Sequence, residues 1–165
     1  MNIVLIGMPG CGKSTVGVLL AKTLLRDFVD TDLIIQNRYG ASLCALIEKY
    51  GLSGFKDIEN KVLSEFRSEN SVIATGGSAV YGEEAMKNLK ENGKAVYLKL
   101  SPEDIVRRID NITTRGIAME KGSTIADLYA ERAPLYERYA DITVDCTDLG
   151  IEECVLKIRD ALNGV

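Results

Sequence analysis

The residues with the clearest chemical meaning lie near the N-terminus, in the run Gly7–Ser14, which reads GMPGCGKS. This run follows the apolar segment Ile3–Ile6 and precedes a helical pattern. Glycines let a backbone curl until successive N–H groups point inward, and the start of a helix adds the positive end of its dipole. Such a loop binds the phosphates of a nucleoside triphosphate. Lys13 would then reach the β- and γ-phosphates, and the Ser14 hydroxyl would contact Mg²⁺.

The nucleotide contacts expected from this loop are Gly10, Cys11, Gly12, Lys13, Ser14 and Thr15. Cys11 has two interpretations. A thiol at the N-terminus of a helix, among inward-pointing N–H groups, becomes more acidic and more reactive. The alternative, which we favour, is that Cys11 is a small residue that the loop accommodates.

Two carboxylates, Asp30 and Asp32, follow the second apolar run of the chain. In open α/β sheets, ligands bind beyond the carboxyl ends of the strands, so both acids face the region of the phosphate loop. They can divide the chemistry, one acting near a metal ion and the other near the hydroxyl of an acceptor. The alternative is that Asp32 only caps the helix that follows it. The spacing leaves both interpretations open.

Further candidates lie downstream. Gly76 and Gly77 follow an apolar strand and predict a turn where the backbone approaches a ligand closely. The C-terminal half carries Arg107, Arg108, Arg115, Arg132 and Arg138, whose guanidinium groups suit phosphate or carboxylate. For any one of these arginines, a solvated helix face is the explanation we favour. We single out Arg115 because it lies in a stretch, about 111–124, whose length favours a functional lid over a plain surface loop.

Apolar runs bounded by Gly, Asp or Pro alternate with helical patterns, as in βαβ units. Strands are predicted near 2–6, 27–30, 71–75, 95–100 and 141–145. Helices are predicted at 13–25, 32–39, 43–50, 55–67, 82–91, 102–110, 124–138 and 151–162. The 165 residues suffice for one domain with a sizeable core, and no linker or repeat divides them. The sequence therefore predicts an α/β fold with a parallel sheet, in a single domain over residues 1–165.

Composition excludes several classes of function. The net charge of −4 argues against a nucleic-acid partner. The N-terminal apolar segment is too short to cross a bilayer and carries no signal-peptide pattern, so we expect a cytoplasmic protein. The four cysteines form no Cys-x-x-Cys pair and the chain has no histidine, so neither a zinc site nor a disulfide scaffold is expected. Any general base must be a carboxylate, Lys, Tyr or Cys.

Taken together, the motifs resemble those of the shikimate kinase family. The matching segments are Gly7–Thr15, Asp30–Asp32, Phe55–Glu59, Gly76–Val80, a lid with Arg115, and Arg132–Tyr136 with Ala140. Their order and spacing cover nearly the whole chain, and the later motifs distinguish the family because the phosphate loop alone is generic. The resemblance implies ATP-dependent phosphorylation of the shikimate 3-hydroxyl, on a P-loop NTPase-type five-stranded parallel sheet sandwiched by helices. It also implies an acceptor-binding region at about 31–62 and a lid at about 111–124.

The resemblance also implies a role for each matching position. Asp30 would assist Mg²⁺ through water beside Ser14, and Asp32 would hold the acceptor hydroxyls and act as the base. Arg132 would grip the acceptor carboxylate, Arg115 would reach the transferring phosphoryl group, and Arg108 would lie against adenine. The full sets are Lys13, Asp32 and Arg115 for catalysis, and Asp32, Lys56, Gly76, Gly77, Ser78 and Arg132 for the acceptor. ATP and Mg²⁺ are the implied cofactors, in a monomer that binds a small molecule and neither nucleic acid nor membrane.

Two positions depart from the family pattern. Lys56 stands where the family usually has Arg, and a Lys ammonium cannot clamp a carboxylate bidentately. Ser78 takes the place of a third glycine, where it would be strained if that position needs a positive φ. Both changes concern the acceptor, so two alternatives stay open for it: a different hydroxy acid or a nucleoside monophosphate. An ATP-binding switch without phosphotransfer is disfavoured by intact Lys13, Ser14, Asp32 and Arg115.

Overall fold

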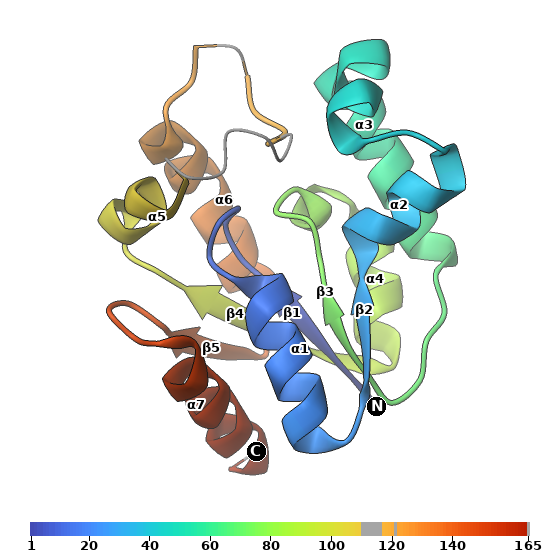
Figure 1. Ribbon diagram of the computed structural model, residues 1–165. Helices are drawn as coiled ribbons and strands as arrows, with labels where there is room; N and C mark the ends of the chain where they lie inside the picture. Colours follow the sequence, from blue (N-terminus) through green and yellow to red (C-terminus); the bar gives the residue numbers. More distant parts are fainter. Residues whose placement is uncertain (110–116, 121, 165) are drawn as a thin grey trace.

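The computed structural model describes residues 1–109, 117–120 and 122–164 (Figure 1). Its elements in chain order are β1 (Asn2–Ile6), α1 (Lys13–Leu24), β2 (Asp27–Asp30), α2 (Thr31–Tyr39), α3 (Leu43–Glu65), β3 (Ser71–Ala74), the 3-10 helix η1 (Ala79–Tyr81), α4 (Glu83–Glu91), β4 (Gly93–Lys99), α5 (Pro102–Ile109), α6 (Ile125–Tyr139), β5 (Ile142–Asp145) and α7 (Ile151–Asn163). All five strands expected from apolar runs are present, each within two residues of its expected bounds.

The strands form one parallel sheet in the order β2-β3-β1-β4-β5, which confirms the predicted fold class. The register places Asp30 of β2 and Leu5 of β1 on either side of Ala74 in β3. Because parallel strands end at the same edge of a sheet, the loops after β1, β2 and β3 meet there. This edge collects the phosphate loop, the two carboxylates and the paired glycines.

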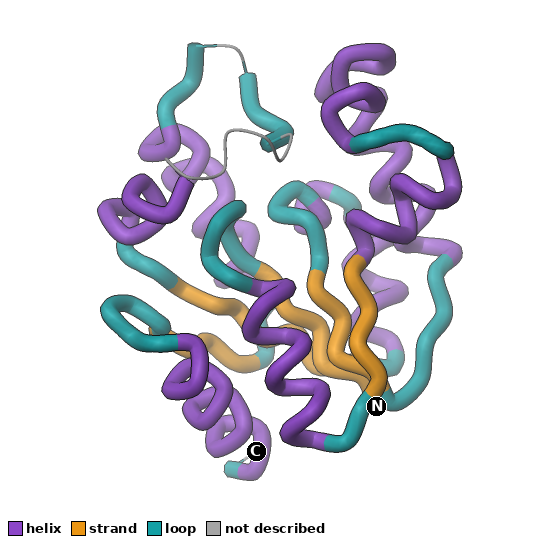
Figure 2. The backbone as a smooth tube through the Cα atoms, in the orientation of Figure 1, coloured by secondary structure: helices purple, strands orange, loops and turns teal. Residues whose placement is uncertain are grey.

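The helices are distributed over both faces of the sheet. α1 and α7 pack together on one face, whereas α4 and α6 contact β4 from the other and α3 packs on α4 (Figures 1 and 2). The chain thus leaves β1 toward one face and β3 toward the other. Ligands in open α/β folds bind at the crevice where the connections after neighbouring strands run to opposite faces of the sheet.

Burial explains the sequence pattern of the central strands. β1 and β3 are buried along their whole length, because helices cover both faces, and so they read as continuous apolar runs. A main hydrophobic cluster joins the sheet to its helices. A second, which we call the α2–α3 cluster, consists of Ile35, Leu46, Phe55, Val62 and Ala118. It fixes the α2–α3 pair, which rises beyond the carboxyl end of β2 (Figure 1).

The helices expected at 43–50 and 55–67 are both present and meet at a kink within α3, which ends at Glu65. Its break is confined to Gly51, whose φ of 69° and ψ of 176° interrupt the helical backbone for one residue. The short helix η1 was not predicted, because three residues carry no readable period. Across the described ranges, no helix is long and apolar enough to cross a membrane.

Candidate active site

A cavity of about 350 Å³ opens at the carboxyl edge of the sheet. Ten of the residues predicted from the sequence line it: Gly10, Gly12, Lys13, Ser14, Thr15, Asp32, Gly76, Gly77, Ser78 and Arg132. The remaining walls come from Pro9, Leu43, Phe55, Glu59, Thr75, Ile117 and Ala118. The cavity therefore lies between the loop after β1, the α2–α3 pair, the turn after β3, and α6 with the segment that precedes it.

The loop after β1 has the geometry of an anion site. Gly10 and Gly12 adopt φ values of 79° and 91°, which side chains with a Cβ rarely reach. Gly12 is the N-cap of α1, and no acidic residue occupies the first turn of that helix. The positive end of the helix dipole therefore faces the cavity without a neutralising carboxylate in that turn.

Lys13 adds a full positive charge to this loop. The side chain is only 7% exposed, and its Nζ donates to the carbonyl oxygens of Gly7 at 2.7 Å and Met8 at 2.8 Å. The third neighbour of Nζ is the Cys11 sulfur, at 3.5 Å. Cys11 is buried and does not line the cavity, so its side chain fills the loop, and its predicted nucleotide contact stays a prediction.

Ser14 and Asp30 form a pair beside the loop. The Ser14 hydroxyl donates to Oδ2 of Asp30 at 2.7 Å, and Oδ1 of Asp30 accepts the N–H of Asp32 at 3.0 Å. Asp30 is thus the N-cap of α2, and the alternative in which Asp32 caps this helix is wrong. Both carboxylates and Ser14 line a second cavity of about 340 Å³ next to the first.

The oxygen atoms of Ser14 and Asp30 suit Mg²⁺. This ion prefers hard oxygen ligands and keeps several waters, taking its other ligands from substrate phosphates. Within the part of the chain that the structure describes, no three His, Cys, Asp or Glu side chains gather into a metal site. A magnesium ion at this place would therefore depend on a bound polyphosphate.

Asp32 and Glu59 meet beside Gly76. A Cβ on Gly76 would lie 2.5 Å from Oε1 of Glu59 and 2.8 Å from Oδ1 of Asp32, closer than real Cβ atoms approach oxygen. The glycine is needed for this close approach and not for a positive φ. It lets two carboxylates from α2 and α3 face the same point of the cavity.

Ser78 pairs with the second of these carboxylates. Its hydroxyl donates to Oε2 of Glu59 at 2.6 Å, and its φ of −92° is ordinary for any residue. The expectation of strain at Ser78 is therefore wrong. Oε1 of Glu59 is buried and has no hydrogen-bond partner. Burial, together with the nearby Asp32, raises the pKa of Glu59 to about 7, against the opposing effects of Ser78, Arg132 and Lys13.

Arg132 is the cation on the acceptor side of the cavity. The residue is 1% exposed, and its guanidinium donates to the carbonyl of Ala118, in the segment before α6. Its Nη1 lies 3.1 Å from the place where Gly77 would carry a Cβ. Tyr136, one turn further along α6, donates its hydroxyl to the Gly77 carbonyl at 2.6 Å. α6 thus holds both the cation and the turn that faces it.

Lys56 lies elsewhere than expected. It does not line the cavity, and its Nζ sits over the ring of Tyr81 at 3.7 Å from the centroid. Arg132 contacts the same tyrosine, because its Nε donates to the Tyr81 hydroxyl at 3.2 Å. The acceptor contact predicted for Lys56 stays a prediction, because Lys56 itself does not line the cavity.

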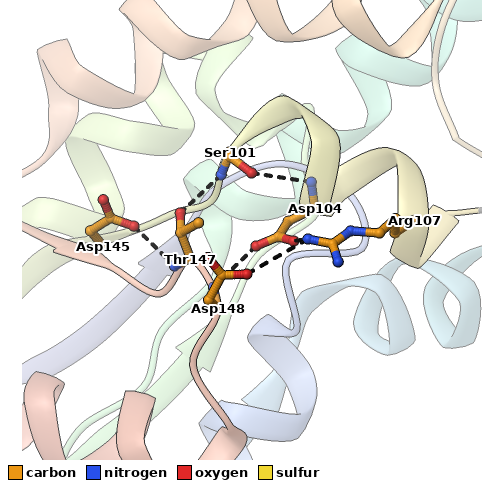
Figure 3. A network of polar contacts seen from close by, with 6 residues as sticks. All are labelled: Ser101, Asp104, Arg107, Asp145, Thr147 and Asp148. Carbon is orange, nitrogen blue, oxygen red and sulfur yellow. Dashed lines mark hydrogen bonds and ion pairs between the residues drawn. The ribbon is translucent and has the colours of Figure 1, made fainter.

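Arg108 lies on the opposite side of the phosphate loop. Its Nη1 would be 3.9 Å from a Cβ on Gly12, and it borders a cleft between α5 and the loop after β5. A polar network holds these two segments together (Figure 3). The N–H of Asp148 donates to Oδ2 of Asp104 at 3.1 Å, and the N–H of Ser101 donates to the Thr147 hydroxyl at 3.1 Å. The adenine contact expected of Arg108 stays a prediction.

Arg115 lies outside the described residues, as does half of the predicted lid, namely 111–116 and 121. Of that stretch, Ile117 and Ala118 line the cavity, and Ala118 packs in the α2–α3 cluster.

The sequence reasoning missed two residues of the site. Glu59 stood in a matching motif without receiving a role, although its spacing of four from Phe55 places both on one helix face. Tyr136 also lay in a matching motif without an assigned role. Its hydrogen bond to Gly77 joins residues that are 59 positions apart in the sequence, which no local pattern reveals.

Comparison with known proteins identifies the family. The family model "Shikimate kinase" matches residues 9–163. A shikimate kinase of Caldanaerobacter subterraneus is 39% identical over 155 residues, which are 92% of this chain and 90% of that protein. The structure of Acinetobacter baumannii shikimate kinase in complex with shikimate is 33% identical, with a TM-score of 0.89 over 99% of this chain and 93% of that one. For the Aquifex aeolicus shikimate kinase, the identity is 36% and the TM-score 0.82, covering 99% and 97%. The chain described here belongs to the shikimate kinase family.

Proposed function

We propose that this protein transfers the γ-phosphoryl group of ATP to a hydroxyl group of shikimate. The observation that carries the proposal is the composition of one cavity. A phosphate loop with Lys13 forms one wall, and Asp32, Glu59 and Arg132 form the other. The similarity over 99% of the chain to a shikimate kinase solved in complex with shikimate supports the choice of acceptor.

The residues divide the reaction between them. The loop N–H groups and Lys13 bind the phosphates of ATP, and Arg132 receives the acceptor carboxylate. Asp32 takes the proton of the reacting hydroxyl. The hydroxyl oxygen forms a bond to the γ-phosphorus while the bond from that phosphorus to the β–γ bridging oxygen breaks, and ADP leaves. Charge on the transferring group develops beside fixed cations, which is the main source of catalysis in phosphoryl transfer.

The remaining assignments are parts of the same proposal. Ser14 and Asp30 would hold Mg²⁺, which neutralises phosphate charge when bound. Arg108 would contact adenine, and Arg115 would reach the transferring group from a lid at about 111–124. Residues 31–62 would form the acceptor-binding region.

The alternative acceptors are not favoured. A nucleoside monophosphate would bring a phosphate to the acceptor side, where among the described residues the acids Asp32 and Glu59 face the same cavity as Arg132. A hydroxylated monocarboxylate suits this arrangement, since one cation meets one carboxylate and the acids accept hydroxyl protons.

A substrate screen tests the proposal. With ATP and Mg²⁺, ADP release should require shikimate and should not occur with nucleoside monophosphates or gluconate. Asp32→Asn keeps the shape of the side chain but removes the proton acceptor, so kcat should fall about 10²- to 10⁴-fold. Asp57→Asn is the matched control, because Asp57 is exposed on α3 and does not line the cavity. Absence of ADP release with shikimate in the unaltered protein would refute the acceptor, and an unchanged kcat in Asp32→Asn would refute the base.

A further inference from the structure

Tyr81 contacts both basic residues of the acceptor side. It ends η1, the short helix that follows the Gly76–Ser78 turn. Lys56 Nζ lies 3.7 Å from the centroid of its ring, and the Arg132 guanidinium carbon lies 5.3 Å from the same centroid. Arg132 Nε also donates to the Tyr81 hydroxyl at 3.2 Å. One side chain thus joins α3, η1 and α6.

The two positive charges beside this ring, on Lys56 and Arg132, are held close together by their shared contact with Tyr81. Lys56 and Arg132 repel each other, and neither has a carboxylate partner among the ion pairs of the described residues. The negative face of an aromatic ring attracts a cation, by about 0.5–2 kcal/mol. The Tyr81 hydroxyl donates to Glu131, so a carboxylate draws the phenol toward α6 from outside. Burial and the bond to Glu131 raise the pKa of Tyr81, which keeps the phenol protonated for this bond.

The same contacts place the two cations differently toward the cavity. Arg132 lines the cavity, whereas Lys56 does not and has its Nζ over the Tyr81 ring. A lysine has four rotatable side-chain bonds and, without the ring, would spread its charge over many positions. Held on Tyr81, Lys56 adds a fixed positive potential near the Arg132 guanidinium.

We propose that Tyr81 is a positioning residue that holds Lys56 and Arg132 as a pair and thereby sets the selectivity of this kinase for an acceptor carboxylate. The inference rests on the proposed function and adds to it a structural basis for recognition of the acceptor carboxylate. It also accounts for the lysine at position 56. A point charge lacks the planar fork of arginine, but it fits the face of a ring.

The test compares acceptors with and without the carboxylate charge. Tyr81→Leu removes ring and hydroxyl, and should raise KM for shikimate about tenfold while leaving KM for ATP and kcat within about twofold. Preference for shikimate over its methyl ester, taken as the ratio of kcat/KM values, should fall by about the same factor. Tyr81→Phe keeps the ring and loses both hydroxyl bonds, so its effect should be smaller, about threefold.

A double-mutant cycle asks whether Tyr81 acts through Lys56. If it does, Tyr81→Leu should raise KM for shikimate by a smaller factor in a Lys56→Met background than in the unaltered protein. The matched control is Tyr50→Leu, which removes an exposed ring that carries Lys49 at 5.0 Å, away from the cavity. An unchanged preference for shikimate over the ester in Tyr81→Leu, or fully additive effects in the cycle, would overturn the inference. Failure of the unaltered protein to phosphorylate shikimate would instead overturn the proposed function.

Discussion

Glu59 is a buried carboxylate with one oxygen that lacks a hydrogen-bond partner. It is 2% exposed, accepts one hydrogen bond from Ser78, and faces Asp32, Arg132 and Lys13. Its raised pKa, about 7 against an ordinary value of 4.5, means that the folded protein retains a proton that the unfolded chain releases between these values. The free energy of unfolding must therefore decrease as the pH rises through this interval.

Glu59→Gln should abolish this part of the pH dependence. Between about pH 4.5 and about pH 7, the unaltered protein should lose stability relative to the variant, by on the order of 3 kcal/mol. Urea unfolding of both proteins across this range measures the difference. Ser78→Gly supplies a second check. The Ser78 bond lowers the pKa of Glu59, so its loss should move the destabilisation to higher pH. Parallel stability curves for the unaltered protein and Glu59→Gln would contradict the assignment.

At the scale of elements, the turn after β3 brings helices α2 and α3 into one site. Gly76 permits this, because any Cβ there would displace Glu59 and Asp32 from the point they share. Gly76→Ala should therefore lower kcat/KM for shikimate at least tenfold, roughly the effect of a misplaced catalytic group. ATP binding, measured by titration with a nonhydrolysable analogue, should stay within about threefold because the phosphate loop belongs to β1 and α1.

The control for Gly76→Ala is Gly164→Ala, whose added Cβ would meet only ordinary contacts of 3.6 Å or more at the end of α7. Equal activity of the two variants would show that the close approach at Gly76 is unimportant. An equal loss of ATP and shikimate binding in Gly76→Ala would point to general unfolding instead.

The elements were predictable because their signals are local. Apolar runs located the strands, and the Gly-Lys-Ser ending located the start of α1. The break between the two expected helices was predicted to span residues 51–54 but is confined to Gly51, because a single residue with positive φ is enough to kink the backbone. Contacts between segments that are far apart in the sequence could not be predicted from such local signals. Lys56 and Glu59 share one helix, and only the packing of α3 decides that Glu59 faces the cavity while Lys56 lies on Tyr81.

At the scale of the molecule, each of the two hydrophobic clusters supports a different part of the binding site. The main cluster holds the sheet from which the phosphate loop emerges. The α2–α3 cluster is smaller, and it supports the helices that carry Asp32 and Glu59. A protein opens locally where few apolar contacts hold it, so the α2–α3 pair should open at a lower free energy than the sheet.

Shikimate binding should suppress this opening. Any opening of the α2–α3 cluster separates Asp32 and Glu59 from Arg132, so the acceptor can bind only to the closed form. A ligand at about 100 times its Kd should therefore slow hydrogen exchange of the Ile35 and Leu46 amides about 100-fold. The amides of Ala161 and Leu162, in the last turn of α7, exchange through fraying that leaves the site intact and should keep their rates. Equal slowing at both places, or none at Ile35 and Leu46, would show that acceptor binding does not depend on this cluster.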